Sequence, residues 1–416
     1  MLHNSPQLFY TSTMKFSTAF LLIAFAASAL ASSLPKRLNV EKHGLNPEKL
    51  AEVRKRMQAF VDDKTIAGAV TLVARYGQIA ALDAVGQADI ANAKPMKPDT
   101  MFWIASMTKP ITATAIMILR DEGKLSIDDP VEKHLPEFKS QWLVGNKSQD
   151  ALTLKRPARP VTLKDLLTHT SGVADAPGPG RDLSLSELVL LYSQQPLKSE
   201  PGSKWEYNNA GINTLGRVVE VVSGETFENF LQKRIFKPLG MKDTTFYPSG
   251  GQIKRVAKSY EPGTNDLNEI GISFIKGPLD ARTRPAFPSG GLFSTAQDMF
   301  RFYQMVLNGG TWDGKRIVSA DSVAVMTRTQ TGDLKTGFTE GMSFGLGWAV
   351  VREPKGVTAM LSKGTYGHGG AYGTQGWVDP EKKMIFVLMI QRAKLQNADA
   401  SPIRQAFQQA AVAALD

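Results

Sequence analysis

The most informative stretch of this chain is Trp103-Ile104-Ala105-Ser106-Met107-Thr108-Lys109-Pro110. It places a lysine three residues after a serine, at the start of an apolar-periodic segment that continues to about Gly123. This periodicity predicts a buried helix that follows the serine directly. An amine one helical turn from a hydroxyl can take the hydroxyl proton and make serine a nucleophile. Ser106 and Lys109 are therefore candidate catalytic residues.

The Ser-x-x-Lys spacing is weak evidence by itself, because it also occurs at Ser12–Lys15, Ser33–Lys36 and Ser273–Lys276. Only Ser106 follows an apolar segment and opens a long helical pattern. A serine there meets unpaired backbone N–H groups and the positive end of the helix dipole. The structural alternative is an ordinary N-cap serine with a solvated lysine, and this tetrad alone favours that alternative.

A second motif lies about a hundred residues later, where a Pro-Gly turn at Pro201 leads to Tyr207-Asn208-Asn209 and then to a helical pattern over residues 212–222. A phenol near a lysine ammonium can lose its proton well below its usual pKa and relay protons. An asparagine can hold a substrate amide or carbonyl with its side chain. The structural alternative makes Tyr207 a core aromatic residue and Asn209 a helix cap.

The third motif is a glycine-rich run near the end of the chain, Tyr366-Gly367-His368-Gly369-Gly370-Ala371-Tyr372-Gly373. Glycines this dense within a strand indicate close approach by a ligand or by another backbone segment. His368 would line that approach. The structural alternative is a loop with a packed histidine.

In this order and spacing, the three motifs resemble the serine β-lactamase and penicillin-binding protein superfamily. The nearest branch is the class C-like one, with family VIII carboxylesterases, D-aminopeptidases and D-alanyl-D-alanine carboxypeptidases. The resemblance covers about Leu45 to Leu415, and three further runs support it: 166–172, 236–241 and 290–295. We interpret these runs as structural. Ser294 and Gln297 fit a capping box, and we expect His169 to pack or hydrogen-bond.

The resemblance implies a role for each matching residue. Ser106 would be the acylated nucleophile, with Lys109 and Tyr207 as paired general bases and Tyr207 protonating the leaving group. Asn209 would orient the substrate beside His368, Gly369 and Gly370. The backbone N–H groups of Ser106 and Ala371 would form the oxyanion hole, at roughly 3–4 kcal/mol per donor.

The chain departs from the resemblance at His368-Gly369-Gly370, where many β-lactamases have Lys-Thr-Gly. A lysine is a permanent cation suited to a β-lactam carboxylate, whereas histidine is mostly neutral at pH 7. The resemblance therefore implies a carboxylesterase or a D-amino-acid peptidase or amidase. The alternatives left open are a penicillin-binding DD-carboxypeptidase, a true β-lactamase, and a sensor that binds penicillin without turnover.

Composition excludes several other classes of protein. The chain has 416 residues, no cysteine and five scattered histidines, so disulfides and thiolate metal sites are excluded and a zinc site is not expected. We expect no cofactor. The net charge of +10 comes from scattered lysines and arginines with no aromatic-basic module, which argues against a nucleic-acid partner. The expected partner is a small ester or amide, or a peptidoglycan-type substrate.

The N-terminus resembles a secretory signal. Lys15 precedes an apolar run over residues 16–30, and Ala29-Leu30-Ala31 suits cleavage after Ala31. The run is short for a bilayer span of about 20 residues, so we expect no stable membrane span. Met14 is the expected initiator, and we expect export to the periplasm or the extracellular space. Residues 32–416 would then form the hydrolase domain.

Strand patterns at both ends of that domain flank a helical middle. A helix is expected from Asn46 to about Asp62, followed by strands at 69–74 and 79–85. Further strands are expected at 344–351, 372–379 and 384–391, and a last helix at 402–415. Residues 140–160 are expected to be a surface loop. The fold class is α+β, an α/β sandwich: an antiparallel sheet lobe (45–105 and 340–416) flanked by helices, plus a mostly helical lobe (106–339).

A rival nucleophile is Ser343 in Gly341-Met342-Ser343-Phe344-Gly345, the Gly-x-Ser-x-Gly pattern of α/β-hydrolases. That pattern needs a strand before the serine and a helix after it. Here a loop precedes it and a strand is expected to follow, and Glu353 is the only acid between Ser343 and His368. We therefore interpret this pentapeptide as unrelated to catalysis.

Overall fold

The computed structural model describes residues 40–176, 183–264, 266–273 and 275–416. The expected signal segment, Met14 and the tetrads at Ser12 and Ser33 lie outside these residues. Within them, no helix is both long enough and apolar enough to cross a bilayer.

An eight-stranded antiparallel sheet joins the two ends of the described chain, in the order β12-β13-β14-β15-β16-β1-β2-β3. Val70 pairs with Met389 where β1 meets β16, so the predicted pairing of the chain's ends is confirmed. The strands are β1 (Gly68–Arg75), β2 (Gln78–Asp89), β3 (Lys94–Pro95), β12 (Met342–Phe344), β13 (Ala349–Val351), β14 (Tyr366–Gly369), β15 (Gln375–Asp379) and β16 (Met384–Met389).

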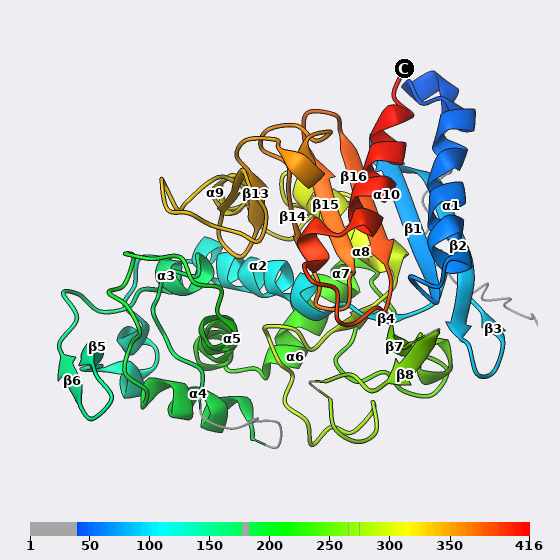
Figure 1. Ribbon diagram of the computed structural model, residues 1–416. Coiled ribbons are helices and arrows are strands. Elements are labelled where there is room, and N and C mark those ends of the chain that lie inside the picture. The colour runs from blue at the N-terminus through cyan, green and yellow to red at the C-terminus, as the bar shows by residue number, and fades with distance from the viewer. Residues whose placement is uncertain (1–39, 177–182, 265, 274) are drawn as a thin grey trace, which may run out of the picture. The chain divides into compact units, whose positions relative to one another are not determined.

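Both faces of this sheet are buried, as alternate side chains of β1 show. Leu72 belongs to the larger apolar core, whereas its neighbour Val73 belongs to a second core. Side chains alternate between the two faces of a strand, so each face needs its own cover. Helices α1 (Pro47–Asp62) and α10 (Pro402–Ala413) pack together over one face, and α8 (Ala296–Leu307) covers the other (Figure 1).

The terminal helices begin where the sequence predicts. The Asn46 side chain accepts a hydrogen bond of 3.0 Å from the Lys49 N–H, and Pro47 occupies the first turn of α1. Ser401 caps α10 in the same way, directly before Pro402. Both starts combine a side-chain oxygen acceptor with a proline whose missing N–H costs no hydrogen bond.

The middle of the chain is built around two packed helices, α2 (Thr108–Asp121) and α5 (Asn209–Ser223). The first twelve residues of α2, from Thr108 to Leu119, are all buried, so this helix is a core element rather than a surface one. Shorter helices surround the pair: α3 (Leu163–Leu167), α4 (Leu185–Ser193), α6 (Phe227–Leu231), α7 (Lys237–Leu239) and α9 (Ala320–Thr327).

Three details of the sequence prediction are wrong. Residues 140–160 contain an exposed hairpin, β5 (Leu143–Lys147) and β6 (Leu152–Lys155), in place of a simple loop. The expected strand at 344–351 is two strands, because a turn separates β12 from β13. The cap of α8 is Thr295, whose side chain accepts from the Asp298 N–H, and not Ser294.

The middle of the chain also contains several short strands, although a mostly helical lobe was expected. Short two-stranded pairs lie between its helices: β4 (Phe102–Trp103) with β9 (Phe293–Ser294), β7 (Ser259–Pro262) with β8 (Leu267–Ile270), and β10 (Thr311–Trp312) with β11 (Lys315–Arg316). The β4–β9 pair matters for function, because it ties the segment before Ser106 to the segment after Gly290.

Candidate active site

Ser106 lies in a tight turn between β4 and α2, formed by Ala105–Met107. Ala105 has a φ of 45°, a left-handed conformation that costs a non-glycine residue on the order of 1–2 kcal/mol. The Thr108 hydroxyl donates a 2.7 Å hydrogen bond to the Ala105 carbonyl and holds the turn. No side chain caps the start of α2, so the N-cap alternative for Ser106 is wrong.

The Lys109 side chain is fully buried and its Nζ contacts three oxygen atoms. They are Ser106 Oγ at 3.1 Å, Asn209 Oδ1 at 2.8 Å and the Ser289 carbonyl at 2.7 Å. The two carbonyl oxygens only accept hydrogen bonds. A neutral amine has two N–H donors and one lone pair, so donation to these two oxygens leaves the lone pair for the Ser106 hydroxyl. An ammonium would instead donate to all three oxygens, so it is the neutral form of Lys109 that these contacts orient as a base toward Ser106.

Burial sets the charge states of the two proposed bases. It holds the pKa of Lys109 well below its usual value, although the charge of Asp175 acts in the opposite direction. Burial raises the pKa of Tyr207, and a hydrogen bond with the Ser106 side chain offsets only part of that rise. Desolvation disfavours the charged form of each group. Burial therefore acts against both the Tyr207 phenolate expected from the sequence and a Lys109 ammonium.

The Tyr207 ring lies beside Lys109, with Nζ 4.7 Å from the ring centroid. Its other neighbours are aromatic: the His169 ring at 4.6 Å and the Phe338 ring at 5.0 Å between centroids. Ser106 interacts with both the amine and the phenol. The serine hydroxyl is thus the point at which the two candidate proton carriers meet.

Asn208 and Asn209 have different roles: one caps a helix, and the other contacts Lys109. Asn208 is the N-cap of α5, since its Oδ1 accepts a 2.5 Å hydrogen bond from the Gly211 N–H. The cap alternative for Asn209 is therefore wrong, and its side chain is directed to Lys109. His169 holds this segment in place, because its Nδ1 accepts a hydrogen bond of 3.1 Å from the Asn208 N–H. The expectation that His169 packs and hydrogen-bonds is confirmed.

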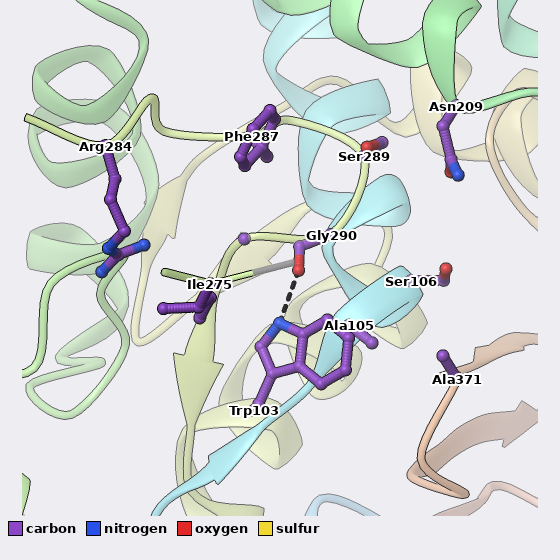
Figure 2. A pocket seen from close by; sticks show the side chains of 11 residues that line it. Trp103, Ala105, Ser106, Asn209, Ile275, Arg284, Phe287, Ser289, Gly290 and Ala371 are labelled. Atoms are coloured by element: carbon purple, nitrogen blue, oxygen red, sulfur yellow. Dashed lines mark hydrogen bonds between the residues drawn. The ribbon is translucent and has the colours of Figure 1, made fainter. Parts of the chain in front are cut away.

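The glycine-rich run ends in a turn beside the Ser106 segment. A Cβ on Gly370 would lie 2.6 Å from the Ile104 carbonyl, and one on Gly369 would lie 1.9 Å from Asp399 Oδ1. The close approach inferred from the sequence is therefore made by the chain itself. The Gly370 N–H donates to the Thr374 carbonyl at 2.7 Å and holds the turn. Ala371 is left exposed next to Ser106 (Figure 2), where an oxyanion hole between their N–H groups is expected.

His368 is buried on β14, and its Nδ1 donates a 2.7 Å hydrogen bond to the Gly369 carbonyl. Its proton therefore lies on Nδ1 and leaves Nε2 as an acceptor, which has no partner among the described residues. Burial and the nearby charge of Lys109 lower the pKa of His368 to about 4. The imidazole is thus neutral at pH 7, as the sequence analysis expects.

A His368→Ala variant should lose part of its activity, mainly through a higher KM for a p-nitrophenyl ester. The reason is that Nε2 is an acceptor without a partner among the described residues, on a ring that lies 6.0 Å from the Tyr207 ring, while the Lys109 contacts with Ser106 do not include His368. A few-fold to about 30-fold loss in kcat/KM corresponds to about 1–2 kcal/mol of binding. Steady-state kinetics on a variant with a normal unfolding transition measures it. Complete loss of acylation would contradict this role.

A pocket lies beside Ser106, and the space in it, including the part open to solvent, is about 430 Å³. Apolar side chains form much of its wall: Trp103, Ile275 and Phe287. The remaining lining residues include Ser106, Asn209 and Ala371 at one end and Arg284 at the other (Figure 2).

Two features of the site are not predicted by the sequence motifs: the apolar wall of the pocket and the Ser289 carbonyl that holds Lys109. A backbone carbonyl leaves no side-chain signal. The run 290–295 does mark the segment, and Trp103 Nε1 ties it down by donating a 2.7 Å hydrogen bond to the Gly290 carbonyl.

The Ser343 hydroxyl has a different environment from that of Ser106. Ser343 sits within strand β12, is buried, and its hydroxyl hydrogen-bonds to Thr331 Oγ1 at 3.1 Å. A strand, β13, follows it in the place where a nucleophile elbow needs a helix. The geometry agrees with the interpretation that the pentapeptide is unrelated to catalysis.

Comparison with known proteins assigns the class. Residues 53–411 match the Beta-lactamase family, and the chain belongs to that family. The sheet and its helices are those of the β-lactamase and penicillin-binding protein fold, and the family is one of serine hydrolases.

Three relatives illustrate the range within the family. Esterase EstB of Burkholderia gladioli is 30% identical over 82% of this chain and 91% of its own length. A putative D-alanyl-D-alanine carboxypeptidase of Escherichia coli K12 is 28% identical over 92% of this chain and 90% of its own length. The structure of EstCE1, a hydrolase with promiscuous acyltransferase activity, superposes with a TM-score of 0.73 at 26% identity, covering 88% of this chain and 99% of EstCE1.

Proposed function

We propose that this protein is a carboxylesterase that works through an acyl-enzyme at Ser106. The observation that carries the proposal is the position of the Ser106 hydroxyl, which meets the Lys109 amine and the Tyr207 phenol and opens onto an apolar pocket. Ser106 Oγ attacks the ester carbonyl while its proton passes to Lys109. The alcohol leaves with a proton delivered by Tyr207. Water then attacks the acyl-enzyme carbonyl and gives a proton to the Tyr207 oxygen, and Ser106 Oγ leaves with the proton held by Lys109, which releases the carboxylic acid and restores both groups.

The two sides of Ser106 suggest which half of the ester lies where. The leaving group must contact Tyr207, its proton donor, and therefore lies toward Tyr207 and His368. Neither of these residues lines the 430 Å³ pocket. The acyl half is left for that pocket, where Trp103, Ile275 and Phe287 provide apolar contacts.

The leaving-group side argues for esters over β-lactams. His368 occupies the position where a lysine would pair with a substrate carboxylate, and its imidazole is neutral at pH 7. The likeness to esterase EstB and to EstCE1 agrees with this choice. The likeness to a putative D-alanyl-D-alanine carboxypeptidase keeps D-amino-acid amides as the second substrate class to assay.

Intact-mass labelling combined with a small substrate panel tests the proposal. A fluorophosphonate should add once, on the peptide that contains Ser106, and p-nitrophenyl butyrate should be hydrolysed with multiple turnovers. Nitrocefin turnover should be weak or absent. A stable stoichiometric penicillin adduct without ester turnover would instead identify a sensor. Rapid nitrocefin hydrolysis would identify a β-lactamase, and preferential cleavage of D-alanine p-nitroanilide a D-amino-acid amidase.

We also propose export, with the hydrolase acting outside the cytoplasm. The support is the sequence pattern alone: Lys15, the apolar residues 16–30, and Ala29-Leu30-Ala31. N-terminal sequencing of the protein from its native host should then begin at Ser32. A mature protein that retains residues before Ala31 would contradict cleavage at that site.

A further inference from the structure

Arg284 is a buried cation at the end of the pocket that lies away from Ser106 (Figure 2). Only 7% of the residue is exposed. Its Nη2 donates to two backbone carbonyls, Phe246 at 3.0 Å and Leu279 at 2.5 Å. Its Cζ lies 5.1 Å from the centroid of the Tyr247 ring. These contacts hold the guanidinium in one place.

Part of the Arg284 guanidinium has no hydrogen bond or ion pair with a described residue. Within the described part of the chain, no carboxylate lies within ion-pair distance of Arg284, and Nε has no hydrogen-bond partner. The structure gives no hydrogen bond from Nη1 to a described residue either. Asp280 is the nearest acid that acts on its charge, but that side chain is exposed. An unpaired buried charge is costly, so such a group favours an anionic partner.

Arg282, two residues earlier, shows the ordinary arrangement. It stacks on the same Tyr247 ring, with Cζ 5.0 Å from the centroid. Its side chain is 70% exposed and forms an ion pair with Glu228 at 3.0 Å. The two arginines therefore share an aromatic neighbour but differ in burial and in pairing.

We infer that the acyl group of the preferred substrate ends in a carboxylate, which Arg284 binds at the far end of the pocket. The inference rests on the proposed function, because it takes Ser106 as the point of acyl transfer. Trp103, Phe287 and Gly290 line the space between the two ends (Figure 2). An apolar middle with a cation at its end suits an acyl chain of several methylene groups that carries a terminal anion. The substrate class is the half-ester of a dicarboxylic acid.

Paired substrates in one assay test the inference. Mono-p-nitrophenyl adipate and suberate carry the terminal carboxylate, and p-nitrophenyl hexanoate and octanoate have the same numbers of acyl carbons without it. The wild-type protein should prefer the anionic member of at least one pair by about 10-fold in kcat/KM, as expected for a charged hydrogen bond. Arg284→Met should reduce this ratio by about 10-fold to 100-fold, and Arg284→Lys should restore part of it.

Arg282→Met is the matched control, and its anionic-to-neutral ratio should equal that of the wild type. A wild-type ratio at or below one for both chain lengths overturns the inference, even if Arg284→Met does not fold, and leaves ester hydrolysis intact. An unchanged ratio in folded Arg284→Met overturns it as well.

Slowing of fluorophosphonate labelling by free adipate tests the same contact without turnover. Adipate should protect Ser106 more strongly than neutral adipamide does, and this difference should vanish in Arg284→Met. If labelling occurs but no ester is hydrolysed, the proposed function fails, and the protection difference alone then decides whether Arg284 binds a carboxylate. Equal protection by the two compounds in the wild type rejects the carboxylate site.

Discussion

Replacing Ser106 with alanine should lower kcat for p-nitrophenyl butyrate on the order of 10³- to 10⁶-fold, because the change removes the hydroxyl that has both a base and a proton donor beside it. Ser106 Oγ lies 3.1 Å from Lys109 Nζ and also interacts with Tyr207. The change removes one oxygen from a partly exposed side chain, so the thermal transition should move little. Steady-state kinetics and fluorophosphonate labelling on the same preparation measure both effects.

Ser343→Ala is the matched control for this prediction. Its hydroxyl is buried and hydrogen-bonded to Thr331, so its removal should cost about 1 kcal/mol of stability and leave kcat within a few-fold of wild type. A variant with alanine at 343 that loses turnover while the variant at 106 keeps it would overturn the assignment of the nucleophile.

The sequence predicts the fold well where local and long-range signals agree. The caps at Asn46 and Ser401 and the proline after each define the terminal helices. The apolar strands from both ends of the chain pair in one sheet, in which β1 lies next to β16. The hairpin at Leu143–Lys155 escapes prediction because its strands bury no regular face, and alternation is the signal by which strands are recognised.

In the candidate site too, some residues could be predicted from the sequence and others could not. Ser106, Lys109 and Asn209 come together as expected, because each carries a reactive or hydrogen-bonding side chain at a helix start. The roles of the Ser289 carbonyl and the Arg284 guanidinium could not be predicted. The first depends on which backbone segment packs over α2, and the second depends on the lack of a carboxylate within ion-pair distance among the described residues. The Tyr207 phenolate was inferred from a neighbouring ammonium, a pairwise signal that leaves out burial, which raises the pKa of Tyr207.

Replacing Lys109 with methionine should lower kcat/KM for the same ester by about 10³-fold at neutral pH, within the 10²- to 10⁴-fold that a positioned general base contributes. Methionine keeps most of the buried volume of the side chain, so the helix should stay packed. Lys204→Met is the control: this lysine is exposed, pairs with Glu206 near Tyr207, and should leave kcat/KM unchanged. A folded Lys109→Met protein with wild-type activity would contradict the role of the amine.

The pH profile separates loss of a base from loss of packing. A base acts when deprotonated, so kcat/KM should rise with pH through the pKa of Lys109 and then level off. Burial lowers that pKa, which shifts the rise well below pH 10.5. The rise should vanish in Lys109→Met but persist in His368→Ala, even though His368 has a pKa of about 4. If the rise instead persists in Lys109→Met and vanishes in His368→Ala, the imidazole is the group whose ionisation limits acylation, and the neutral-amine assignment drawn from the contacts of Nζ is wrong.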